Sequence, residues 1–129
     1  MASSLRNKSQ SERGIELSGS ACVICGWAKT NVKGKPLVEG AHVRKFGNVA
    51  DYDKFDNIIA LCPNHHTEFD CGNFCIDFDK RVCCHANPAD ELNGKKLAGR
   101  ISHVRRGYFE HHRIHVFKGG VKTHVAMCK

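Results

Sequence analysis

Residues 61–70, LCPNHHTEFD, hold most of the side chains in this chain whose types and spacing could do chemistry. Cys62 and His65 have the Cys-x-x-His spacing of a zinc site, and the upstream CVIC sets Cys22 and Cys25 at the matching Cys-x-x-Cys spacing. We expect these four side chains to bind one zinc ion as a Cys3His set. Because four protein ligands complete a tetrahedral shell, this zinc would be structural.

A second histidine, His66, directly follows His65. Neighbouring side chains on a helix point about 100° apart, so the two cannot easily serve the same small centre. Asp70 lies one turn further on, on the same helix face as His66. Such a pair can hold a divalent metal or orient a phosphate. It needs partners across the site, and the preceding strands offer His42 and Asn57.

The eight cysteines also allow disulfides as an alternative. The first residues lack the apolar stretch of a secretory signal, so we expect a cytoplasmic protein whose thiols stay reduced. Cys71, Cys75, Cys83 and Cys84 could form a second zinc site. Adjacent residues on a strand face opposite sides, so we favour packing of these cysteines as small apolar side chains.

The elements that must position these side chains can be predicted from the local pattern. Segments 37–43 and 57–62 have the short apolar character of strands, with a long polar loop between them. Pro63 suits the first turn of a helix and Gly72 its end, which predicts a helix over 63–71. The core order is therefore zinc knuckle, strand, loop, strand, helix, an α+β arrangement.

The C-terminal half adds a hairpin and a helix to this core. The segments NFCIDF and RVCCHA, separated by two residues, indicate two paired strands. Residues 103–118 predict a basic amphipathic helix with an imperfect apolar stripe. The stripe consists of Val104, Tyr108, Ile114 and Phe117. The histidines His111, His112 and His115 are expected on a DNA-facing or solvated side of this helix.

We predict three parts of the chain. Residues 1–19 are rich in Ser and charge and are expected to be a flexible tail. Residues 20–80 would be the zinc-stapled core. Residues 81–129 would be a basic extension that packs on the core and contacts DNA.

The charge distribution supports a polyanionic partner. The formal net charge is +7, and residues 80–129 carry eleven Lys and Arg against three Asp and Glu. Nucleic acid is the obvious polyanion, and a merely solvated basic surface is the alternative. No apolar run approaches the 18 or so residues that a membrane span needs, so no membrane partner is expected.

Together, the segments EGAHVRKFG and DNIIALCPNHHTEFDCGNF, with the upstream CVIC, resemble the HNH endonucleases of the ββα-metal class. The resemblance covers residues 22–79 and is nearest to small restriction-type domains with a structural zinc. It implies a ββα-metal core followed by the hairpin and the C-terminal helix.

The resemblance also implies residue roles. His42 would be the general base that takes a proton from the attacking water. Asn57 would hold the active-site loop, and orient His42 or bind the metal. His66 and Asp70 would bind the catalytic divalent metal.

One position departs from the family pattern. Many relatives carry a metal ligand immediately before the general base, where this chain has Ala41. The metal set must then come from His66, Asp70, Asn57 or Glu39. Mg²⁺ suits the oxygen ligands, and histidine ligation also allows Mn²⁺, Co²⁺ or Ni²⁺. Phosphate contacts are expected from five basic side chains: Arg44, Lys45, Arg105, Arg106 and Arg113.

The leading hypothesis is a metal-dependent DNA endonuclease in restriction or defence. A single ββα-metal site cuts one strand, so cleavage of double-stranded DNA at both strands would need a homodimer. One alternative is a zinc-stapled DNA-binding module without catalysis. Such a module would have no need for His42, Asn57 and His66. The other alternative is a nicking endonuclease of homing or phage type.

Overall fold

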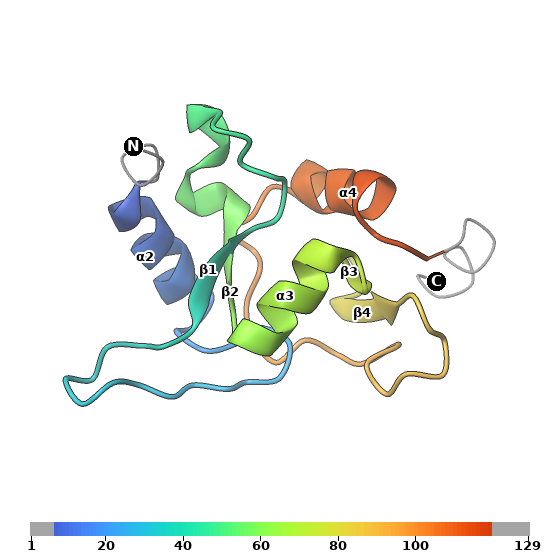
Figure 1. The fold of residues 1–129 in the computed structure, drawn as a ribbon, viewed down its shortest axis with the longest axis horizontal. Coiled ribbons are helices and arrows are strands. Elements are labelled where there is room, and N and C mark those ends of the chain that lie inside the picture. Colours follow the sequence, from blue (N-terminus) through green and yellow to red (C-terminus); the bar gives the residue numbers. More distant parts are fainter. Residues whose placement is uncertain (1–6, 120–129) are drawn as a thin grey trace.

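The core of the protein is a two-stranded antiparallel sheet between two helices (Figure 1). The structure is a computed structural model and describes residues 7–119. Strand β1 (Glu39–His42) pairs with β2 (Ile58–Leu61). Helix α2 (Lys8–Leu17) contacts both strands from one side, and α3 (Pro63–Cys71) contacts both from the other.

This sandwich explains why β2 is apolar at every position. All four of its residues are buried, because α2 and α3 cover opposite faces of the strand. A strand exposed on one face would instead alternate apolar and polar residues. The antiparallel register places His42 opposite Ile58, at the end of the hairpin next to the loop that joins the strands.

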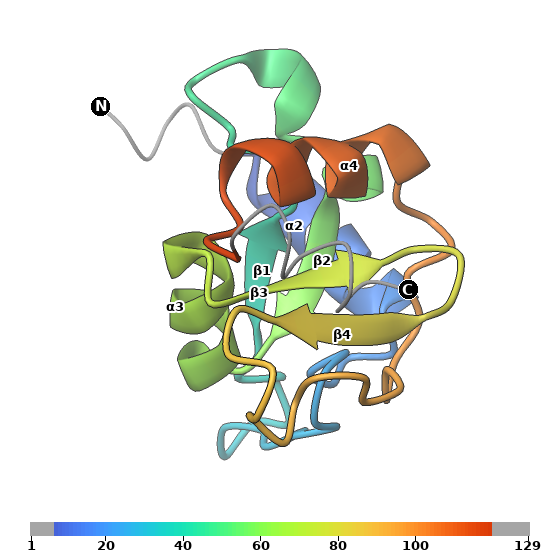
Figure 2. The same cartoon turned by 90° about the vertical axis from the view of Figure 1, so that its right-hand side faces the viewer.

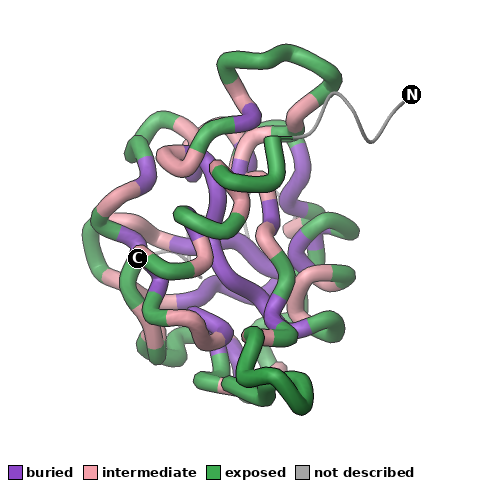
Figure 3. The backbone as a smooth tube through the Cα atoms, turned by 90° about the vertical axis from the view of Figure 1, so that its left-hand side faces the viewer, coloured by how far each residue is buried: buried purple, intermediate pink, exposed green. Residues whose placement is uncertain are grey.

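A second hairpin and a last helix extend the core. Strand β3 (Phe74–Asp77) pairs with β4 (Val82–His85), and α4 (Arg106–His115) contacts β3 (Figure 2). Buried positions gather along the inner elements, whereas the outer loops are exposed (Figure 3). Phe69, Phe74 and Phe109 are the largest fully buried side chains.

The predicted α+β fold is confirmed, and several of its boundaries are close. The helix runs from Pro63 to Cys71 as expected, and Gly72 ends it in the left-handed region at φ 82°. The loop between β1 and β2 contains two short 3₁₀ turns, η1 (Ala50–Tyr52) and η2 (Phe55–Asn57).

The prediction of a flexible tail over residues 1–19 is wrong for α2. Asn7 caps this helix through its side chain, which accepts a hydrogen bond from the Gln10 backbone N–H at 3.3 Å. The helix has few apolar residues, so its sequence alone does not indicate burial. Tertiary contact holds it instead: a Cβ added at Gly14 would lie 2.7 Å from Ile58 Cβ, which shows how closely α2 approaches the sheet.

The predicted apolar stripe of the last helix is also partly wrong. Ile114 is 61% exposed, while Phe109 and His112 form the buried face of α4. His112 therefore does not belong to a solvated or DNA-facing side. Its ring stacks on Phe69 at 3.7 Å between centroids, and its Nε2 lies 2.9 Å from the Phe69 carbonyl oxygen. Residues 120–129 of the predicted extension lie outside the described residues.

None of the helices that the structure describes is long and apolar enough to cross a membrane.

Candidate active site and metal centre

The four predicted zinc ligands come together at the junction of β2 and α3. The Sγ atoms of Cys22, Cys25 and Cys62 and a ring nitrogen of His65 all lie within 4.8 Å of one another. His65 Nδ1 is 3.3 Å from Cys62 Sγ and 3.6 Å from Cys22 Sγ. Zinc–ligand bonds of about 2.0–2.3 Å in a tetrahedron separate ligand atoms by about 3.6 Å, so the set fits zinc.

Local backbone structure presents these ligands. Gly26, at φ 81°, allows the tight turn in which its N–H donates to the Cys22 carbonyl at 2.8 Å. Cys62 is the N-cap of α3, and its Sγ accepts the His65 backbone N–H at 3.4 Å. The four ligands thus bring the Cys22–Cys25 turn, which precedes β1, next to the first turn of α3.

The protonation chemistry of the cluster suits a cation. Burial and two neighbouring thiols raise the pKa of Cys62 to about 11, so a bare thiolate is unfavourable there. A bound zinc ion supplies the positive charge that makes thiolates stable. Burial lowers the pKa of His65, which favours the neutral imidazole that binds metals.

A separate pocket brings His42, His66 and Asp70 together. A cavity of about 500 Å³ is lined by these three side chains and by the loop that follows β1. Its other lining residues are Gly40, Lys45, Phe46 and Gly47. Within α3, His65 thus joins the cysteine cluster while His66 lines the pocket, as the 100° rotation between neighbours requires.

His66 is held between two carboxylates. Its Nδ1 lies 2.7 Å from Glu39 Oε1, and its Nε2 lies 3.2 Å from Asp70 Oδ2. The hydrogen bond to Asp70 and then that to Glu39 raise the pKa of His66, against the opposite effect of burial. Glu39 and Asp70 therefore contact opposite nitrogens of one ring.

This arrangement has a consequence for metal binding. With metal–ligand bonds of about 2.1 Å at right angles, two ligand atoms lie about 3 Å apart, which matches the spacing of His66 Nε2 and Asp70 Oδ2. Glu39 would then accept the Nδ1–H, as carboxylates commonly do behind metal-binding histidines. Ala41 is fully buried and offers no ligand, so the expected departure at this position stands.

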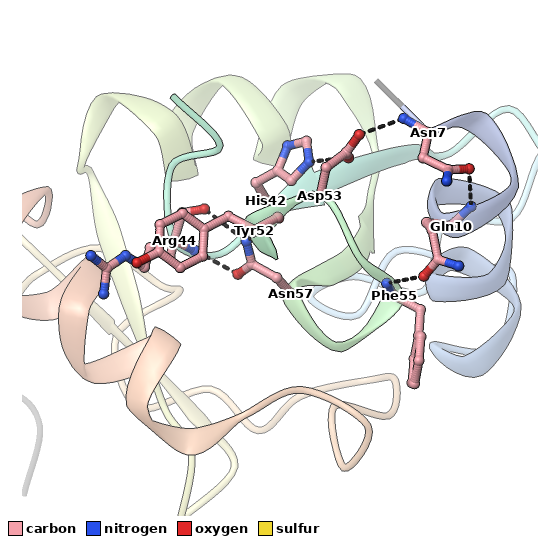
Figure 4. Close-up of polar contacts among 8 residues, drawn as sticks. All are labelled: Asn7, Gln10, His42, Arg44, Tyr52, Asp53, Phe55 and Asn57. Carbon is pink, nitrogen blue, oxygen red and sulfur yellow. Dashed lines mark hydrogen bonds and ion pairs between the residues drawn. The ribbon is translucent and has the colours of Figure 1, made fainter. Parts of the chain in front are cut away.

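His42 has a partner that the sequence did not indicate. Its Nε2 lies 2.8 Å from Asp53 Oδ1 (Figure 4). Its ring also stacks on Phe46, with centroids 5.2 Å apart and planes at 15°. Asp53 is one of several acidic residues in a polar loop, and only the tertiary structure distinguishes it by burying it. One feature of the sequence indicated this contact: Asp53 lies in the loop that follows β1, the strand that holds His42.

Asn57 fastens the loop between the strands. It is fully buried, its Oδ1 accepts the Arg44 N–H at 2.8 Å, and its Nδ2 donates to the carbonyls of Arg44 and Tyr52 at 2.9 and 2.7 Å. These bonds use the side-chain amide for backbone contacts (Figure 4). The geometry therefore favours the predicted loop-holding role of Asn57 over metal binding.

The basic side chains predicted to contact DNA occupy different settings. Lys45 lines the pocket, and the Arg44 guanidinium lies 4.3 Å from the centre of the Tyr52 ring. The other three lie at or on α4, and each reaches an acidic partner. Arg105 donates to Asp56 at 2.8 Å, Arg106 to Asp79 at 3.1 Å, and Arg113 to Glu110 at 2.7 Å.

Cys75, Cys83 and Cys84 pack in the interior rather than forming a second cluster, whereas Cys71 is exposed. Cys83 belongs to the main core, and Cys75 and Cys84 lie in a smaller cluster with Phe117. Burial raises the pKa of Cys83 to about 12. Within residues 7–119, only the Cys3His set brings three or more metal-binding side chains this close together.

Comparison with known proteins agrees with this geometry. Residues 22–77 match the family model described as HNH endonuclease. A solved structure named "Modification dependent TagI restriction endonuclease" is similar, with 25% sequence identity and a TM-score of 0.65. The similarity covers 92% of this chain and 41% of that chain, so this chain spans less than half of that enzyme. No curated protein matches the chain.

Both the cysteine–histidine cluster and the residues His42, His66 and Asp70 fall inside the matched segment. The fold is that of a domain found in a restriction endonuclease. The resemblance that the sequence motifs indicated is therefore confirmed: residues 22–77 match the HNH endonuclease family.

Proposed function

We propose that this protein is a metal-dependent endonuclease that hydrolyses phosphodiester bonds in double-stranded DNA. One observation carries the proposal: His42, His66 and Asp70, which come from β1 and α3, line the same open pocket. A zinc-stapled binding module would need the Cys3His cluster but would have no use for this pocket. The family match of the same segment supports the enzyme.

His42 is the general base in this proposal. Its Nδ1 accepts a proton from a water molecule, and the water oxygen forms a bond to the phosphorus. The bond from phosphorus to the 3′ oxygen breaks, and that oxygen leaves with the electron pair and takes a proton from solvent. The products are a 5′ phosphate and a 3′ hydroxyl. Imidazole suits this role because its ordinary pKa lies near neutrality.

His66 and Asp70 are the proposed ligands of the catalytic metal. Mg²⁺, Mn²⁺, Co²⁺ or Ni²⁺ bound there would offset the negative charge that grows on the phosphate and the leaving oxygen. Asn57 keeps the loop around His42 in place through its backbone contacts. Zinc at the cysteine cluster has a structural role.

The basic side chains supply the proposed DNA contacts. Lys45 lies in the pocket wall and would contact the phosphate under attack. Arg44, Arg105, Arg106 and Arg113 would contact flanking phosphates, the last three by exchanging their acidic partners for DNA. Cleavage of both strands would require a homodimer.

Restriction is the proposed biological setting, because the similar solved structure is a restriction endonuclease. That enzyme's name describes it as modification dependent. Since this chain spans 41% of it, we carry over restriction and leave the choice of modified or unmodified DNA to experiment.

The test is cleavage of supercoiled plasmid by zinc-loaded protein with Mg²⁺, Mn²⁺, Co²⁺, Ni²⁺ or EDTA. We expect metal-dependent nicking or linearisation that His42→Ala lowers by about 100-fold or more. Thr67→Ala is a matched control, because Thr67 is exposed on α3 beside His66 and does not line the pocket.

Plasmids with and without base modification should be compared in the same assay. Absence of cleavage of every plasmid by folded, zinc-bound protein would contradict the proposal and favour the DNA-binding module. Retention of full activity in His42→Ala would contradict the assignment of the base.

A further inference from the structure

Asp53 is an acidic residue buried beside the proposed general base. It is 3% exposed, although it belongs to a loop of mostly polar residues. Its Oδ1 lies 2.8 Å from His42 Nε2, and its Oδ2 accepts the backbone N–H of Asn7. Burial of a carboxylate is costly unless its oxygens are hydrogen-bonded, so this placement depends on both contacts.

The contact determines which ring nitrogen of His42 carries hydrogen. An ionised carboxylate can only accept hydrogen bonds, so Nε2 must donate. In the neutral imidazole the other nitrogen, Nδ1, then has the lone pair that can accept a proton. Stacking on Phe46 fixes the plane of the same ring. His42 is thereby held in one orientation and one tautomer.

We propose that Asp53 is a positioning residue that keeps His42 in the Nε2–H tautomer, and that helix α2 serves the active site by holding Asp53. The inference rests on the proposed role of His42 as general base. The part played by α2 goes beyond the family match, since this helix lies outside residues 22–77.

Helix α2 reaches the loop through two neighbouring contacts (Figure 4). Asn7, at its N-cap, donates to Asp53, and Gln10 Oε1 accepts the Phe55 backbone N–H at 2.8 Å. Asn57 holds the same loop from the other side through Arg44 and Tyr52. The residues that present Asp53 are thus tied both to α2 and to the start of β2.

Close approach of α2 to the sheet makes these contacts possible. A Cβ added at Gly14 on α2 would lie 2.7 Å from Ile58 Cβ and 2.9 Å from the Ile58 carbonyl oxygen, so the approach of α2 to β2 depends on glycine at this position. The helix could not occupy the same place with a larger residue at Gly14.

The first test measures the tautomer directly, without DNA. Two-dimensional ¹⁵N–¹H spectra of zinc-loaded protein, with the His42 signals assigned by His42→Gln, identify which ring nitrogen carries hydrogen. We expect hydrogen on Nε2 in the neutral ring. Hydrogen on Nδ1 in the unchanged protein would overturn the proposal whether or not the protein cleaves DNA.

The second test compares Asp53→Asn with Asp51→Asn. The same chemical change is made in the same loop, but the Asp51 side chain is 86% exposed. We expect Asp53→Asn to lower the single-turnover cleavage rate by about 100-fold or more, with unchanged DNA affinity and with loss of the fixed tautomer. Asp51→Asn should leave both unchanged. An unchanged rate and tautomer in folded Asp53→Asn would overturn the role of Asp53.

The third test addresses α2 with Gln10→Leu and Gln10→Glu. Leucine removes the acceptor for the Phe55 N–H, while glutamate keeps one. We expect Gln10→Leu to lower the cleavage rate and broaden the His42 signals, and Gln10→Glu to retain both. Equal behaviour of the two variants and the unchanged protein would overturn the role of α2. Should the unchanged protein show the Nε2–H tautomer but no cleavage, the proposed function fails while the positioning contact stands.

Discussion

At the scale of single residues, the two adjacent histidines of α3 illustrate how the 100° rotation between neighbouring helix residues separates two sites. His65 Nδ1 faces the cysteines, while both nitrogens of His66 face carboxylates at the pocket. A change at either position should therefore affect one site and spare the other.

We expect His65→Ala to lose zinc and stability, and His66→Ala to retain zinc and lose metal-dependent cleavage. Removing a ligand leaves three, and the energy of zinc binding is largely folding energy in small domains. Zinc content per chain and thermal unfolding measure the first effect, and plasmid cleavage the second. If His66→Ala released zinc and His65→Ala did not, His66 rather than His65 would be the zinc ligand.

Glu39 provides a second prediction at this scale. Replacement by Ala removes the acceptor for His66 Nδ1, so we expect the divalent metal concentration for half-maximal cleavage to rise by about 10- to 100-fold. Glu39→Gln keeps an acceptor and should have a smaller effect. Equal metal requirements in the two variants and the unchanged protein would exclude a role for Glu39 in metal binding.

At the scale of elements, helices α2 and α4 both depend on contacts that their own sequences scarcely indicate. Gly14 on α2 faces Ile58 at close range, whereas nothing lies within 4 Å of a Cβ added at Gly107 on α4. The same substitution should therefore act in opposite directions in the two helices.

We expect Gly14→Ala to destabilise the protein by about 1–3 kcal/mol, because the new methyl group meets Ile58 and its carbonyl oxygen. Gly107→Ala should stabilise it by about 0.5–1 kcal/mol, since alanine restricts the unfolded chain and favours helix. Urea unfolding of both variants measures the difference. A stabilising effect of Gly14→Ala would mean that α2 does not pack on β2.

His112 predicts how the packing of α4 on α3 responds to pH. Burial lowers the pKa of His112 to about 4, while a histidine in the unfolded chain titrates near 6.5. The unfolded state therefore binds more protons below pH 6.5. Stability should fall as the pH drops from about 6.5 towards 4, by about 2 kcal/mol between pH 7 and 5.

The comparison variant is His112→Leu, which removes the titrating group. The Phe69 carbonyl keeps a donor there, because Gly72 N–H also reaches it at 3.1 Å. Acid weakens zinc binding in both proteins, so the measured quantity is the difference between their slopes of unfolding free energy against pH. Equal slopes would show that folding does not lower the pKa of His112.

At the scale of the whole molecule, the Cys3His cluster lies where the knuckle meets the β2–α3 junction, and α2 packs on the opposite face of the sheet. Removal of zinc by a strong chelator should therefore lower the thermal stability and abolish cleavage. Added Mg²⁺ should not restore activity, whereas Zn²⁺ followed by Mg²⁺ should. Full stability of the zinc-free protein by circular dichroism would contradict a structural role.

The sequence by itself determined the features that depend on local spacing. Cys-x-x-Cys and Cys-x-x-His motifs indicated the zinc ligands, Pro63 and Gly72 indicated the ends of α3, and the 100° rotation separated His65 from His66. Two apolar segments indicated strands β1 and β2. Each of these depends on chemistry within a few residues of chain.

Only the tertiary structure decided the features that depend on distant contacts. Asp53 looks like its acidic neighbours in sequence, and burial against His42 and Asn7 distinguishes it. Helix α2 has little apolar pattern, and its closest approach to the sheet is made by Gly14, which faces Ile58. His112 is buried because Phe69 lies beneath it. The contacts of Asn7 with Asp53 and of Phe69 with His112 join residues more than 40 positions apart, and that of His42 with Asp53 spans 11. No local pattern encodes them.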